Sequence, residues 1–150
     1  MNSAQADTYS HMTTADATIH VQQSATISAT LTQANGALHA GDWGEGQQVA
    51  TLQVNLQNGD VFSSPAARWT PAYPKQDPVA GCEACRNIES ALGEGVLPLK
   101  LTCADANSVD GWQFVLGADV MTCTIATAQL ARGVVAGNYT LSLDAALRTE

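Results

Sequence analysis

The chain has little charge, and above all little positive charge. Only 13% of its 150 residues are charged, against about a quarter in an average soluble domain, and 14 acidic side chains outnumber 6 basic ones. The formal net charge of −8 would repel a nucleic-acid backbone or an anionic membrane surface. No stretch approaches the ~18 consecutive apolar residues of a membrane span. We therefore expect neither nucleic acid as a partner nor insertion into a membrane.

Patterns typical of catalysis and of metal binding are also missing. No Gly-x-Ser-x-Gly motif is present, and the histidines, His11, His20 and His39, lie in the N-terminal stretch and in a glycine-rich loop, away from any candidate nucleophile. Acidic pairs such as Asp42 and Glu45 lack the regular set of oxygen ligands that a calcium loop needs. The sequence predicts no enzyme, no cofactor and no metal site.

The chain does contain four cysteines, an even number. In such a composition Cys82, Cys85, Cys103 and Cys123 predict two disulfides and an oxidising compartment, periplasmic or extracellular. A zinc ribbon would need two C-x-x-C pairs, and only one is present. Because Cys103 and Cys123 flank the expected strand at Trp112, we favour a bond between them and a local Cys82–Cys85 loop. A bond from Cys82 or Cys85 to Cys103 is the alternative.

Apolar and polar residues alternate along most of the chain, which is typical of half-buried β-strands. The length fits one domain with its own core. Alternation and turn signals such as Asn58-Gly59 predict about seven or eight strands and an antiparallel β-sandwich of immunoglobulin type, or a small barrel. The alternating segments are residues 15–31, 52–56, 96–101, 112–116, 121–125 and 139–147.

Two segments depart from the alternation. Residues 64–81 hold four of the five prolines and show no clear period. Residues 85–92 carry apolar side chains at Cys85, Ile88 and Leu92, a spacing that predicts two turns of helix ended by Gly93. We therefore expect a loop followed by one short helix in the middle of the chain.

Several segments together resemble a known family. They are the alternating stretches TTADATIHV (13–21) and ATISATL (25–31), the glycine-rich stretch leading to residues 49–52, and VAGNYTLSL (135–143). In this order they resemble a chaperone–usher pilus subunit, of the branch that holds capsule-like antigens, Dr-type adhesins and aggregative adherence fimbriae. Residues 63–95 and the cysteines have no counterpart in that resemblance.

The resemblance implies an incomplete immunoglobulin-like fold that a donor strand from the next copy completes. Residues 1–22 would be the extension and residues 23–150 the pilin domain. An extended peptide with alternating apolar residues both fills a groove and pairs with an open sheet edge. The alternative is one long bent edge strand over residues 14–31 of a complete fold. The implied donor residues are Ala15, Ala17, Ile19 and Val21.

A function and its partners follow from the same resemblance. It implies a structural subunit of a fimbria on the cell surface, with host-cell adhesion as a further candidate activity. The implied partners are other copies of the chain, a periplasmic chaperone, an outer-membrane usher and a host-cell receptor. We expect receptor contacts within residues 64–95, with Trp69 and Tyr73 as aromatic anchors. The alternative function is a monomeric secreted binding module stapled by two disulfides.

The N-terminus suggests export. Ala4-Gln5-Ala6 has the small-x-small form of a signal-peptidase site, so residues 1–6 are interpreted as the tail of a removed signal peptide.

Overall fold

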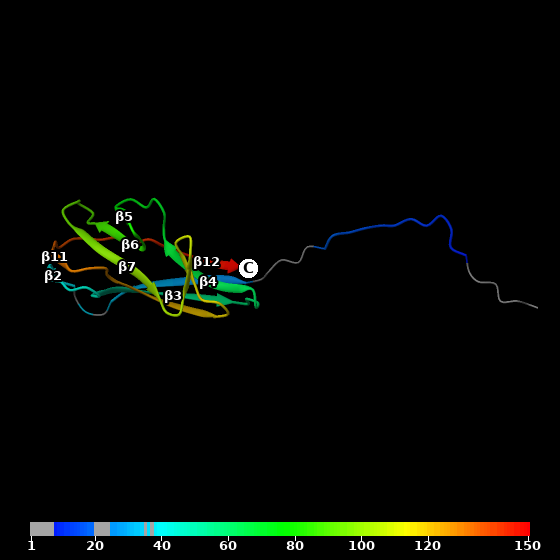
Figure 1. Cartoon of the computed structure of the whole chain (residues 1–150), viewed down its shortest axis with the longest axis horizontal. Coiled ribbons are helices and arrows are strands. Elements are labelled where there is room, and N and C mark those ends of the chain that lie inside the picture. The colour runs from blue at the N-terminus through cyan, green and yellow to red at the C-terminus, as the bar shows by residue number, and fades with distance from the viewer. Residues whose placement is uncertain (1–7, 20–24, 35, 37) are drawn as a thin grey trace, which may run out of the picture.

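The computed structural model describes residues 8–19, 25–34, 36 and 38–150, and it is all-β (Figure 1). Two expectations fall outside the described residues, the donor residue Val21 and the signal-peptidase site at residues 4–6. Nowhere in the described part of the chain is there a helix of the length and hydropathy that a membrane crossing requires.

The strands form two main antiparallel sheets and a short pair. The larger sheet has the spatial order β1-β3-β10-β7-β6-β5 and the smaller one the order β12-β4-β9-β8, while β2 pairs with β11. The strands of the larger sheet are β1 (Thr26–Gln33), β3 (Gln48–Gln57), β5 (Gln76–Val79), β6 (Cys82–Glu89), β7 (Val96–Cys103) and β10 (Val120–Thr127). The others are β2 (Gly41–Trp43), β4 (Ser63–Trp69), β8 (Asn107–Val109), β9 (Trp112–Phe114), β11 (Ala131–Val134) and β12 (Leu143–Thr149).

The core lies between the two sheets. Alternate residues of a strand point to the same face, and in β3 the alternation predicted from sequence buries Leu52 and Val54. Leu99 of β7 contributes from the same sheet, and Ala67 and Trp69 of β4 complete the cluster from the opposite sheet. This arrangement confirms the predicted antiparallel sandwich.

Both disulfides form, in the pairing that the sequence favoured. Cys103 of β7 and Cys123 of β10 are directly opposite each other in the ladder, with their Cα atoms 3.9 Å apart. The second bond joins Cys82 to Cys85 at the start of β6. All four cysteines are oxidised, which leaves no thiolate for zinc.

The predicted helix over residues 85–92 is wrong. Residues 82–89 form β6, which pairs with β5 on one side and β7 on the other. Ile88 and Cys85 lie on opposite faces of the regularly paired stretch of β6, and both are buried, Ile88 in the core and Cys85 in the loop that the disulfide closes. The three-residue spacing of these apolar side chains therefore resembles a helical period in the sequence. Pairing with β5 and β7 nevertheless makes the segment a strand.

The proline-rich segment over residues 64–81 is also more ordered than expected. It contains most of β4 and all of β5. Pro78 lies in β5, the last strand of its sheet, where a missing N–H removes no necessary ladder bond.

Candidate functional site

Two strands with an unpaired edge lie next to each other. Among the residues that the structure describes, β1 is the last strand of the larger sheet and β12 the last strand of the smaller one, so each has a hydrogen-bonded neighbour there on one side only. The two strands contact each other where the sheets meet. Long open edges are unusual in soluble proteins because their free N–H and C=O groups can bind another chain.

The side chains of β1 show that its inner face is uncovered. Ala29 pairs with Val54 and Leu31 with Leu52 across the β1–β3 ladder. The two β3 partners are buried, whereas Ala29 is exposed and 41% of Leu31 is accessible to solvent. A complete sandwich would cover both ends of such pairs. In β12, six of the seven residues are only half-buried, which indicates the same incomplete cover.

A groove of about 810 Å³ continues from these edges toward β2 and β11. The segment 135–142 belongs to no strand and forms one wall, where the Tyr139 hydroxyl donates to the Val135 carbonyl over 2.7 Å. Apolar walls beside free strand edges suit an extended peptide with alternating apolar side chains. The apolar lining includes Leu31, Leu97, Leu99, Val134, Tyr139 and Leu141.

The predicted donor residues lie away from this groove in their own chain. Residues 8–19 form no strand, and Figure 1 shows this blue segment running away from the sheets. Ala15, Ala17 and Ile19 are all exposed, Ile19 to 85% of its surface. The structure thus contains an uncovered groove and, separately, an uncovered apolar segment.

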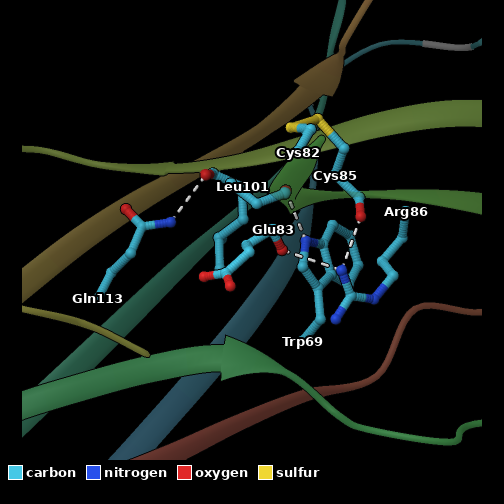
Figure 2. Close-up of a disulfide and its surroundings, with 8 residues drawn as sticks. Trp69, Cys82, Glu83, Cys85, Arg86, Leu101 and Gln113 are labelled. Carbon is cyan, nitrogen blue, oxygen red and sulfur yellow. Dashed lines mark hydrogen bonds between the residues drawn. A yellow bond between two sulfur atoms is a disulfide. The ribbon is translucent and has the colours of Figure 1, made fainter. Parts of the chain in front are cut away.

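The predicted receptor residues are in different environments. Trp69 is only 2% exposed, and its indole Nε1 donates to the Ala84 carbonyl over 2.8 Å (Figure 2). A receptor has no access to this ring. Tyr73 is half-buried in the connection between β4 and β5.

The Cys82–Cys85 loop covers Trp69 rather than forming a free recognition loop. Arg86 closes the loop, because its Nη1 donates to the carbonyls of Glu83 (2.9 Å) and Cys85 (2.7 Å) (Figure 2). Burial lowers the pKa of the Arg86 guanidinium, and the nearby Glu83 carboxylate opposes that shift. These contacts give the loop a structural role around the core tryptophan.

Comparison with known proteins supports the assignment of the fold. No protein-family model and no curated protein sequence matches the chain. Among solved structures, the SafD adhesin of Salmonella is similar with a TM-score of 0.68 and 16% identity, over 82% of this chain and 84% of that one.

Two further structures, both from Escherichia coli, are similar to the same extent. HdaB, the minor tip subunit of the Hda pilus, gives a TM-score of 0.66 and 16% identity, over 83% of this chain and 84% of that one. A structure concerned with fibronectin binding by enteroaggregative AAF fimbriae gives a TM-score of 0.63 and 9% identity, over 83% of this chain and 98% of that one. The resemblance found in the sequence is therefore confirmed at the level of structure: the chain has the fold of the chaperone–usher fimbrial subunits and adhesins.

Proposed function

We propose that the chain is a structural subunit of a cell-surface fimbria whose copies join head to tail by donor-strand complementation. Residues 1–22 of one copy would occupy the groove of the next, within residues 23–150. The observation that carries this proposal is the pair of open edges, β1 and β12, beside an uncovered apolar groove.

The chemistry of the exposed segment fits this role. Ala15, Ala17 and Ile19 share one side of an extended chain, and a strand added along the free edge of β1 or of β12 would find unpaired backbone groups there. Burying a side chain such as that of Ile19 contributes about 1.5–3 kcal/mol. A contact between two different surfaces of the same molecule leaves both ends of the assembly open, so it propagates into a fibre.

Such a subunit needs partners before it reaches the surface. An isolated copy would expose its groove during transit through the periplasm, where uncovered apolar surface and strand edges promote aggregation. A periplasmic chaperone that covers the groove and an outer-membrane usher that exchanges it for the next copy belong to the proposal. Host-cell adhesion by the exposed faces of the assembled subunit also belongs to it.

Paired substitutions in the extension test the proposal. Ile19→Asp would place an unpaired charge in the groove, at a cost larger than the burial that it replaces, whereas Thr18→Asp points to the opposite side of the strand. We expect wild type and Thr18→Asp to give a ladder of polymers on a non-reducing, unboiled gel. Ile19→Asp should give monomers.

The two residues make a matched pair, since they are adjacent and both exposed in the single chain. A fibre formed by Ile19→Asp as readily as by wild type would contradict the proposal. A single sharp monomer band from wild type at all concentrations would instead favour the monomeric secreted binding module.

A further inference from the structure

A second hollow, separate from the groove beside β1 and residues 135–141, lies on the outer face of the smaller sheet. It has a volume of about 340 Å³, within the range of small-molecule sites. Its lining comes from β4, β12, β8, β9 and the turn between β8 and β9, and includes Ala66, Ala146, Trp112, Phe114, Asp110 and Arg148. We call this hollow the outer cleft.

The strand register builds the floor of the outer cleft. Ala66 pairs with Ala146 on one side and with Phe114 on the other, so these three side chains form a row across the sheet. Ala67, the next residue, faces the core, so Ala66 faces outward. Two alanines beside larger neighbours leave a depression, and Trp112, two residues before Phe114, stands on the same face.

Two arginines hold the aromatic walls in place. The guanidinium carbon of Arg148 lies 3.9 Å from the centre of the Phe114 ring, and that of Arg68 lies 4.3 Å from the Trp112 ring. Arg68 is itself fixed by Asp144, with Nε and Oδ2 3.1 Å apart. Stacked guanidinium groups restrict the rings, so the outer cleft is preorganised before any ligand arrives.

The outer cleft offers both a hydrogen-bond donor and an acceptor. Arg148 Nη1 is buried and has no hydrogen-bond partner among the described residues; its ion pair with Glu150 Oε1 is long, at 3.6 Å. A buried donor of this kind gains from an acceptor on a ligand. Asp110 supplies an exposed carboxylate at the rim, in the turn between β8 and β9.

The charge balance selects the class of ligand. Each of the two arginines has an acidic neighbour, Arg68 in Asp144 and Arg148 in Glu150, whereas the carboxylate of Asp110 forms no ion pair with any described residue. The Asp110 carboxylate would repel an acidic ligand, and the Nη1 donor of Arg148 needs a hydrogen-bond acceptor, which an ammonium group lacks. A neutral molecule with hydroxyl groups, which both donate and accept, satisfies the two groups. It must also present an apolar face to the rings and hydroxyl groups to Asp110 and Arg148.

A neutral hexopyranose has these properties, with C–H groups on its faces and hydroxyls at its edge. We propose that the outer cleft binds a neutral pyranose of a glycan, its ring against Trp112 and its hydroxyls on Asp110 and Arg148. This inference names the receptor class for the adhesive part of the proposed function and rests on that part alone.

Saturation-transfer NMR on the full chain, in whichever assembly state it adopts, tests the inference. The probes are the methyl glycosides of galactose, glucose, mannose, N-acetylglucosamine and N-acetylgalactosamine, with N-acetylneuraminic acid as the acidic comparison. We expect transfer to at least one neutral glycoside, strongest at the C–H protons of one ring face, and none to the acid.

Asp110→Asn and Asp105→Asn locate the binding. Both aspartates are exposed and both have a left-handed backbone, with φ of 53° and 58°, which asparagine tolerates. Only Asp110 lines the outer cleft. Replacing a charged acceptor with a neutral amide weakens a hydrogen bond, so we expect the affinity for the glycoside to fall about tenfold for Asp110→Asn and to stay like wild type for Asp105→Asn.

Three results would overturn the inference: no transfer to any neutral glycoside, transfer to the acid alone, or equal behaviour of the two variants. Both variants should still form the polymer ladder of wild type. If no sugar binds but the polymer ladder is intact, only the proposal of a sugar site in the outer cleft is refuted. If wild type forms no ladder, only the proposal of fimbrial assembly is refuted.

Discussion

A single buried glutamine replaces a strand at the free edge of β7. β6 pairs with β7 only as far as Lys100, and beyond it the Gln113 side chain takes over. Its Nε2 donates to the Leu101 carbonyl over 2.9 Å (Figure 2), and its Oε1 accepts from the Cys103 N–H over 3.0 Å. The amide thus reproduces the donor and acceptor of a neighbouring backbone at a buried position.

Replacing this amide with a side chain of similar shape should be costly. Gln113→Met would leave one buried donor and one buried acceptor unpaired, and we expect the free energy of unfolding to fall by about 2–4 kcal/mol. The measurement is the shift of the urea midpoint at constant slope.

The matched control for this substitution is Gln48→Met. Gln48 is exposed and, within the described part of the chain, its amide donates one hydrogen bond, to the Thr51 hydroxyl, so a change within about 0.5 kcal/mol is expected. Similar losses for both variants would show that the Gln113 amide has no special role.

At the scale of the element, β9 shows what a sequence pattern cannot determine. The alternation of Trp112 and Phe114 predicts that they face the core and that Gln113 faces solvent. Pairing with β4 sets the opposite register, in which Gln113 stands beside Ala67 and points inward, and Phe114 stands beside Ala66 and is covered by Arg148. A shift of the register by one residue turns every side chain of a strand to the opposite face, and pairing with the partner strand determines the register.

The longer strands were predictable from the sequence, because their alternation allows only one register. In β3 and β10 the alternation continues over a full strand and matches partners on both sides, so only one register buries the apolar set. The groove was implied only through the family resemblance. The outer cleft was missed, because its alanines and arginines carry no signal until three strands are side by side.

The two disulfides should differ in their effect on stability. In the chain-entropy account, the Cys103–Cys123 bond, with a sequence separation of 20, contributes about 3 kcal/mol and the Cys82–Cys85 bond, with a separation of 3, about half of that. Converting each pair to alanine and comparing urea midpoints in the same assembly state measures this. A larger loss from the short loop would mean that its contacts over Trp69, rather than chain entropy, dominate.

On the scale of the whole molecule, charge opposes the association of copies. Each chain carries a net charge of −8, so two copies repel each other at long range. The groove is lined mainly by uncharged residues, and the repulsion therefore comes from the rest of the surface.

Raising the ionic strength should accelerate assembly. The screening length shortens from about 30 Å at 0.01 M salt to about 10 Å at 0.1 M, which removes most repulsion between approaching copies. Light scattering of the purified chain should show a faster rise at the higher salt concentration. A rate that falls with salt would mean that attraction between charged patches guides the encounter.

The bond between Cys103 and Cys123 also determines how such a fibre would respond to tension. The part of the chain between the two cysteines contains β8 and β9, and a covalent bridge across neighbouring strands holds its ends together. If flow pulled a subunit open, these residues would not contribute to its extension. With a sequence separation of 20 between the bridged cysteines, 3.9 Å between their Cα atoms and ~3.3–3.6 Å per extended residue, each opened subunit would lengthen by about 65 Å less than its full contour.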